Sequence, residues 1–173
     1  MSTSSEAFAN QGKAAFADKK YMQAAELFEQ AAQAYDHAGD MLMAAEMQNN
    51  RSVALLQAGK PGDALDAVAG TDKVFAEAKD IKKQAMAFGN QGAALEELKQ
   101  YEEALKAYEK SSELFGEAGE TEMRSMIMQS AAAIKLRQGK IMDSAFSMIG
   151  SADTVQKPTF GQRILKFFLR FIK

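Results

Sequence analysis

The sequence predicts an all-α protein in which paired helices stack into a solenoid, and three observations predict this fold class. The 173-residue chain repeats itself with a period of about 40 residues. Its apolar residues follow helical steps of three and four within each repeat. It contains only two prolines, Pro61 and Pro158, so long helices are not interrupted. A fixed period of this length is typical of solenoids, in which each unit buries its apolar face only against its neighbours.

Columns of equivalent residues, spaced one period apart, carry the repeat. One column of small residues contains Gly12, Ser52, Gly92 and Ala132, and a second contains Ala24, Ala64, Ala104 and Ser144. A column of large residues contains Phe28, Val68, Tyr108 and Met148. Small residues let a neighbouring helix approach, and large residues fill the space between helices. We therefore expect these columns to pack the core.

The spacing predicts eight helices, at about 4–18, 21–38, 41–58, 61–78, 81–98, 101–118, 121–138 and 141–150. Thr3 and Glu6 form a capping box at the first of them. Glycines are placed to stop helices in the left-handed conformation, at Gly39, Gly59, Gly119 and Gly139. Asp40, Asp80 and Glu120 then favour the start of the next helix. Lys79 interrupts the glycine pattern, so we expect a less sharply capped joint there.

Charge and composition exclude several classes of function. The net charge of −2 divides unevenly, because residues 1–156 carry 16 basic and 23 acidic side chains, a net of −7, and five basic residues follow them. An acidic body speaks against nucleic-acid binding. The chain has no cysteine, which excludes disulfides and thiolate metal sites. The N-terminus is polar and no apolar run reaches the roughly 18 residues of a spanning helix, so we expect a cytoplasmic protein.

The units resemble the tetratricopeptide repeat. The third unit matches best, through Asn90, Gly92, Leu95, Tyr101, Ala104 and Tyr108. The fourth unit is degenerate, and the 40-residue period departs from the usual 34 of the family. The resemblance covers residues 5–150 and implies a right-handed α-solenoid of four tetratricopeptide-like helix pairs over 1–151, in units at about 5–40, 41–80, 81–120 and 121–151. It also implies a non-enzymatic scaffold or adaptor that binds a protein or peptide ligand.

One polar column repeats as faithfully as the packing columns: Asn10, Asn50, Asn90 and Ser130. On a helix, Asn90 points away from the packed face that contains Phe88 and Gly92. The resemblance places this column in a concave groove lined by the first helix of each pair. Because an amide both donates and accepts hydrogen bonds, the column could hold the backbone of an extended peptide. The alternatives are simple drift after duplication, or asparagines that bond neighbouring helices to one another.

The same geometry predicts further groove residues. These are Lys13, Asn49, Val53, Gln57, Met86, Ala93, Met126 and Gln129. Met86 and Met126 would form an adaptable apolar patch, or else pack between helices. The set of basic residues with which chaperone-binding relatives clamp a C-terminal carboxylate is not matched, because Met86 and Asn90 stand where basic groups would be needed.

A basic, phenylalanine-rich segment follows the repeats. Residues 152–159 read as a linker, and Thr159 with Gln162 predicts a capping box that opens a helix over 160–173. Projection at 100° per residue separates a basic arc from a wide apolar arc. The basic arc contains Arg163, Lys166, Arg170 and Lys173, and the apolar arc contains Ile164, Leu165, Phe167, Phe168, Leu169, Phe171 and Ile172.

Three surfaces could receive this C-terminal helix. It could dock on an anionic membrane or a partner, which would make the protein peripheral to a membrane. It could instead cap the solenoid or occlude its groove, as part of a closed structural module. It could also pair with another copy, and the oligomeric state stays open. No catalytic residue, cofactor or metal site is predicted, since the single histidine, His37, lies near a helix end with no catalytic partner.

Overall fold

The structure is a computed structural model that describes residues 4–151, with side chains described up to residue 139. The predicted capping residue Thr3, the linker 152–159 and the C-terminal helix 160–173 lie outside the described residues. The chain divides into two units, residues 1–135 and residues 136–173.

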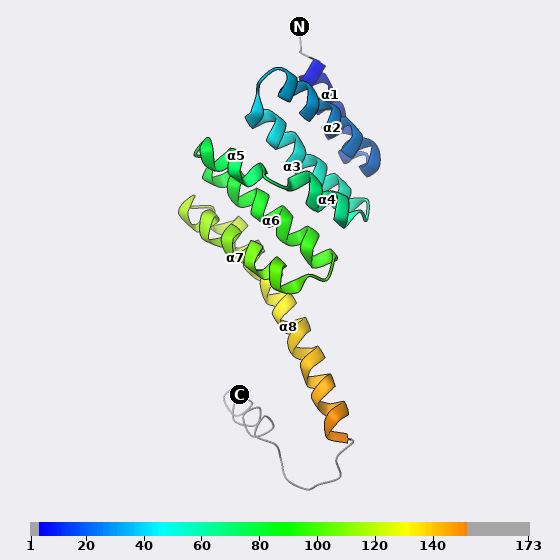
Figure 1. Ribbon diagram of the computed structural model, residues 1–173, viewed down its shortest axis with the longest axis vertical. Coiled ribbons are helices and arrows are strands. Elements are labelled where there is room, and N and C mark those ends of the chain that lie inside the picture. The colour runs from blue at the N-terminus through cyan, green and yellow to red at the C-terminus, as the bar shows by residue number, and fades with distance from the viewer. Residues whose placement is uncertain (1–3, 152–173) are drawn as a thin grey trace. The chain divides into compact units, whose positions relative to one another are not determined.

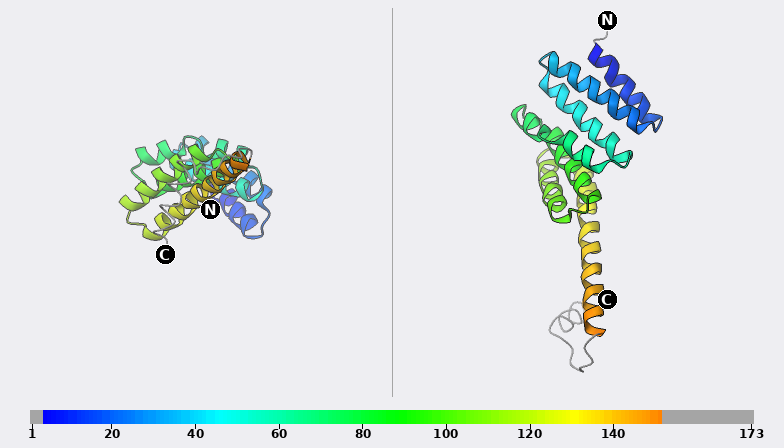
Figure 2. Two further views of the ribbon diagram at one scale, coloured as in Figure 1. Left: turned by 90° about the horizontal axis from the view of Figure 1, so that it is seen from below. Right: turned by 45° about the vertical axis from the view of Figure 1, so that its right-hand side comes forward.

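Every regular element of the described residues is an α-helix. The helices are α1 (Ser4–Ala17), α2 (Tyr21–His37), α3 (Met41–Gln57), α4 (Pro61–Val68), α5 (Thr71–Glu77), α6 (Ile81–Glu97), α7 (Tyr101–Glu117) and α8 (Thr121–Ser151). Within residues 1–135, neighbours in the chain pack side by side as antiparallel pairs, α1 with α2, α3 with α4, and α6 with α7 (Figure 1). The right-hand view of Figure 2 shows the same side-by-side packing of α1, α2 and α3. The predicted all-α solenoid of helix pairs is confirmed.

A single type of joint recurs at regular intervals along the chain. The residues at 19, 39, 59, 79, 99 and 119 all have positive φ values, between 59° and 78°. After each of them, a backbone N–H donates to the carbonyl at the fifth position before it at 2.9 Å, for example Asp40 N to Tyr35 O and Asp80 N to Phe75 O. This is the Schellman motif, which satisfies the last carbonyls of a helix. The same joint therefore occurs within units, at 19, 59 and 99, and between units, at 39, 79 and 119.

Lysine takes the left-handed place at three of these joints. Lys79 has φ 59°, and its joint has the same hydrogen bond as the glycine joints. The Asp80 side chain accepts from Lys83 N at 2.9 Å, just as Asp40 accepts from Met43 N at 3.0 Å. The expectation of a less sharply capped joint at Lys79 is therefore wrong. The joint therefore keeps the same backbone conformation and hydrogen bonds where its left-handed residue has a Cβ.

Two elements differ from the predicted helices. The helix expected at 61–78 is divided into α4 and α5, because Ala69 is extended (ψ 126°) and Gly70 is left-handed (φ 78°). The Thr71 hydroxyl then donates to Val68 O at 2.9 Å and closes the break. The turn expected at Gly139 is absent, and α8 runs through it to Ser151. A glycine permits a turn but does not impose one, so the fourth helix pair of the prediction is a single long helix.

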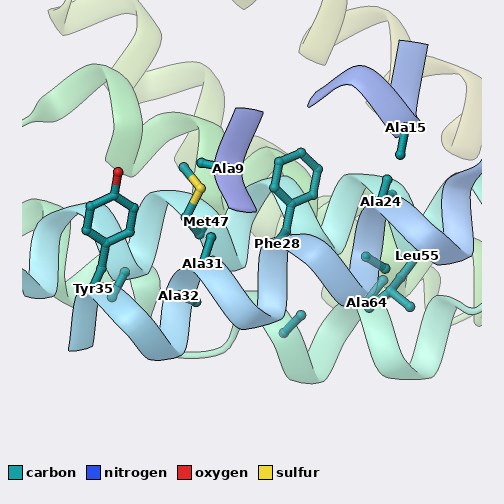
Figure 3. Close-up of a cluster of buried hydrophobic side chains, with 14 of the residues drawn as sticks. Ala9, Ala15, Ala24, Phe28, Ala31, Ala32, Tyr35, Met47, Leu55 and Ala64 are labelled. Carbon is teal, nitrogen blue, oxygen red and sulfur yellow. The ribbon is translucent and has the colours of Figure 1, made fainter. Parts of the chain in front are cut away.

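The core consists of small residues packed under large ones, as the columns predict. A Cβ built on Gly12 would lie 2.8 Å from the Phe28 ring, and one built on Gly92 would lie 2.6 Å from the Tyr108 ring. Figure 3 shows Phe28 and Tyr35 on the same side of α2, clustered with Met47 of α3 and Ala9 of α1. Contacts this close require glycine, which explains Gly12 and Gly92 of the first column. Ser52 of the same column is buried, whereas Ala132 is exposed and does not pack the core as predicted.

Ion pairs link successive units. Lys83 of α6 lies 2.9 Å from Glu46 of α3, and a hydrogen bond to that carboxylate raises the pKa of Lys83. Arg51 of α3 lies 3.1 Å from Glu29 of α2. All four side chains are partly exposed, so each pair contributes little to stability. Their main effect is to fix how neighbouring helices align.

Candidate peptide-binding groove

A small hollow lies between the first and second units on the side formed by α1 and α3. It has a volume of about 200 Å³ and is lined by Lys13 and Phe16 of α1, Phe28 of α2, and Asn50 and Val53 of α3. Three of these five residues, Lys13, Asn50 and Val53, are among the predicted groove residues. The structure therefore brings together residues that the sequence places in different repeats.

The hollow has an apolar floor and a polar rim. The Phe28 side chain is buried, and the Phe16 and Val53 side chains are half-buried. Phe16 is held by an edge-on contact with Tyr21, with ring centroids 5.3 Å apart. At the rim, Lys13 is exposed and Asn50 is half-buried. The floor can receive an apolar side chain, while the ammonium and the amide can bind carbonyl or carboxylate groups beside it.

Phe16 and Phe28 are the residues that sequence reasoning missed. Phe28 belongs to the column of large residues, so the pattern predicts packing alone. One edge of its ring packs on Gly12 and the ring also lines the hollow. The periodicity shows that an aromatic residue packs in the core. It does not show whether the same ring also lines a hollow at the surface. The helical spacing of Lys13 and Phe16 on α1 is the one available signal.

The remaining predicted groove residues lie on the first helices of their units. Asn10 on α1 and Gln57 on α3 are exposed, Met86 on α6 is 38% exposed, and Ala93 on α6 is half-buried. On α8, Met126 is 57% exposed, Gln129 is exposed and Ser130 is half-buried. One alternative was that Met86 and Met126 pack between helices. Their exposure shows that they do not pack fully there. None of these residues lines the hollow beside Asn50.

Asn49 is a correction to the predicted groove. Its side chain is only 5% exposed, and its Oδ1 accepts from the Thr71 hydroxyl at 3.4 Å and from Asn90 Nδ2 at 3.5 Å. Its position next to Asn50 turns it by about 100° around the helix, toward the break between α4 and α5. Asn49 therefore satisfies buried polar groups and does not face a ligand.

Asn90 has a partner inside the protein. It is half-buried, and its amide reaches Asn49 of the preceding first helix. This matches the alternative in which asparagines bond neighbouring helices. Of the asparagine column, Asn10 and Asn50 are then the members best placed for a ligand.

A second hollow opens on the opposite side of α3. It has a volume of about 460 Å³, and α2, α3 and α4 contribute most of its lining. Its charged residues are Glu26, Glu29, Arg51, Asp63 and Asp66, and Arg51 is paired with Glu29. Ala69 and Thr71, at the break between α4 and α5, complete one wall.

Within residues 4–151, no helix is long and apolar enough to span a bilayer. The same residues contain no cluster of three or more side chains suited to hold a metal ion.

Comparison with known proteins identifies the fold. No family model and no curated protein matches the chain. Among solved structures, the chain is similar to the TPR domain of Sgt2 from Aspergillus fumigatus, with a TM-score of 0.64 and 22% sequence identity. The match covers 94% of this chain and 95% of that domain. A structural similarity at 22% identity shows the fold alone, and the chain has a tetratricopeptide-repeat fold.

Proposed function

We propose that this protein is a non-enzymatic interaction scaffold that binds a peptide segment of a partner protein along the first-helix side of its solenoid. The observation that carries the proposal is the hollow where Lys13, Asn50 and Val53 meet over the rings of Phe16 and Phe28. This arrangement combines an apolar anchor site with polar groups at its edge, which is the usual composition of a binding hot spot.

The size of the hollow favours a peptide over a small molecule. Small-molecule sites usually enclose about 300–1,000 Å³, whereas this hollow encloses about 200 Å³. One apolar side chain of a peptide would enter it. The peptide backbone would then bond the Asn50 amide, and Lys13 would favour an acidic residue or a terminal carboxylate nearby.

The polar and methionine residues of the later first helices would extend this site. Met86 and Met126 offer exposed, adaptable apolar surface, and Asn10, Gln57 and Gln129 offer polar contacts. Ser130 instead hydrogen-bonds to the Tyr108 side chain. In this proposal the hollow anchors the peptide, and the remaining residues contribute shape and selectivity.

The non-enzymatic part of the proposal rests on the family resemblance and on the surroundings of the single histidine and of Tyr108. His37 is exposed at the end of α2. The pKa of Tyr108 is raised, but by burial and by its hydrogen bond to Glu96 within the packed pair of α6 and α7. Neither residue lines either of the two hollows. A cytoplasmic location also belongs to the proposal and rests on the sequence.

A selected peptide would test the groove. A library of displayed peptides is panned on the full chain, and the affinity of a selected peptide is measured by fluorescence anisotropy. We expect Asn50→Ala to weaken binding about fivefold, since a hydrogen bond contributes roughly 1 kcal/mol, and Val53→Asp to weaken it further. Gln30→Ala, an exposed change on α2, is the matched control and leaves the affinity unchanged. Selected peptides that bind the double variant Asn50→Ala/Val53→Asp normally would contradict the proposed site.

The C-terminal segment has a second candidate role. From the sequence it could dock on an anionic membrane or a partner, or cover the solenoid itself as a closed module. The closed module is favoured by exposed apolar residues on one face of α8, Met128 and Leu136.

A further inference from the structure

An apolar stripe on α8 is exposed to solvent. Met128, Ala132 and Leu136 follow one another at intervals of four and therefore share one face of the helix. Met128 is 55% exposed, Leu136 is 65% exposed, and Ala132 between them is exposed as well. The opposite face of α8 contains Ile134, which is fully buried and packs with Ala104 and Tyr108. The helix thus buries one face and leaves an apolar one open.

The equivalent stripe on α6 is covered by a second helix. One repeat earlier in the sequence, the stripe falls on Phe88, Gly92 and Glu96. The Tyr108 ring of α7 lies against Gly92, and the Tyr108 hydroxyl donates to Glu96 at 2.9 Å. The same relation holds on α1, where the Phe28 ring of α2 lies against Gly12. In these units an aromatic ring of the second helix therefore sits on the small residue of the first.

The stripe on α8 lacks such a cover among the described residues. In register, the covering helix would be residues 141–150, but these residues continue α8 and do not turn back at Gly139. A large–small–large stripe of this kind suits a helix that contributes an aromatic side chain over Ala132. A helix that covers this stripe would come from outside residues 4–151.

We propose that the C-terminal segment 160–173 packs as a helix over the Met128–Ala132–Leu136 stripe. This segment has the chemistry that the stripe requires, because its apolar arc contains Phe167, Phe168 and Phe171. Its basic arc would face outward on an acidic protein, since residues 1–156 carry a net charge of −7. This inference is independent of the proposed peptide groove.

The length of the connecting chain allows this packing. The part of α8 from Ala132 to its end at Ser151 is about 28 Å long along the helix axis. The linker 152–159 spans up to about 26–29 Å when extended, and the helix from its start at 160 to Phe167 adds about 10 Å. Phe167 can therefore return to the level of Ala132 with slack to spare.

The absence of cysteine in the chain gives a direct test. In the full chain, Ala132→Cys is combined with a cysteine at position 167, 168 or 171 in turn, since the packing register selects one of them. The matched control combines the same tail cysteines with Ala14→Cys, an equally small change at an exposed position of α1. Disulfide formation is followed in dilute solution by non-reducing electrophoresis, and circular dichroism checks that each variant keeps the wild-type helix content.

We expect at least one Ala132→Cys pair to close a disulfide within the monomer at least tenfold faster than its Ala14→Cys control. Equal rates at the two positions, or no disulfide with either, would overturn the proposal. Disulfide-linked dimers would overturn it in favour of a second copy as the occupant. Flotation of the wild-type chain with phosphatidylserine vesicles, together with no selective disulfide, would overturn it in favour of a membrane. A Leu136→Cys series repeats the test at a second position of the stripe.

Discussion

Replacing Gly92 by alanine tests how closely α6 and α7 approach. The new methyl carbon would lie 2.6 Å from two carbons of the Tyr108 ring, a distance that van der Waals contact does not allow. Tyr108 is only 3% exposed, and its hydroxyl is held by Glu96, so the ring cannot move freely. Overpacking of this kind costs about 1–3 kcal/mol. Displacement of the hydrogen bond adds about 1 kcal/mol, and the better helix propensity of alanine returns about 1 kcal/mol.

The expected result is therefore a loss of about 2 kcal/mol in the free energy of unfolding, or a fall of roughly 4–8 °C in Tm for a chain of this size. Urea unfolding followed by circular dichroism measures it. Gly62→Ala is the control, because a Cβ at this helical glycine has nothing within 4 Å. It should raise stability by about 0.5 kcal/mol through helix propensity alone.

The second unit suggests a rescue. There the corresponding pair is Ser52 and Val68, a larger residue opposite a smaller one, and both are fully buried. Tyr108→Val in the Gly92→Ala background should relieve the clash, so the double-mutant cycle should show a favourable coupling of about 1–3 kcal/mol. A Gly92→Ala protein as stable as the wild type, or a cycle without coupling, would refute the close-approach argument.

Three further predictions concern single positions. Ser52 Oγ is buried with no hydrogen-bond partner among the described residues, so Ser52→Ala should raise the free energy of unfolding by about 1 kcal/mol in urea unfolding; a loss would mean that the hydroxyl is satisfied. Lys79 has a positive φ, so Lys79→Gly should raise Tm by a few degrees, whereas Gly39→Ala at the equivalent joint should lower it. Burial and the hydrogen bond to Glu96 raise the pKa of Tyr108 above its ordinary value near 10, so stability is fully present below about pH 10 and falls above it, as the unfolded chain ionises first. Tyr108→Phe should flatten the decline in urea midpoint above about pH 10, and an unchanged slope would contradict the assignment.

The packing glycines Gly12 and Gly92 and the helix starts at Asp40 and Asp80 were predictable from sequence, because the repeat places the same residue types at equivalent positions. Ala132 of the same small-residue column is exposed. A ring that packs on Gly12 excludes a side chain there, and the same rule acts again at Gly92 in the third unit. Asp40 and Asp80 cap their helices for the same local reason. Local rules therefore recovered the fold.

The exceptions come from tertiary context. Gly70 breaks a helix that was predicted to continue over 61–78, and Gly139 does not stop a helix where a turn was predicted. The difference depends on neighbours, since the break at Gly70 is secured by Thr71, whose hydroxyl also reaches Asn49 of another helix. Asn49, which was predicted to line the groove, is buried beside this break.

The regularly spaced left-handed joints have a consequence for how this protein can be rebuilt. Because each joint has one backbone geometry and one hydrogen bond whether its residue is glycine or lysine, the joints are interchangeable connectors. A cassette of one repeat, cut at positions 40 and 80, carries matching ends and could be deleted or duplicated in frame. Each added cassette would lengthen the stack by one helical unit. Genes of this kind can therefore grow by tandem duplication, with each new copy free to diverge in what it binds.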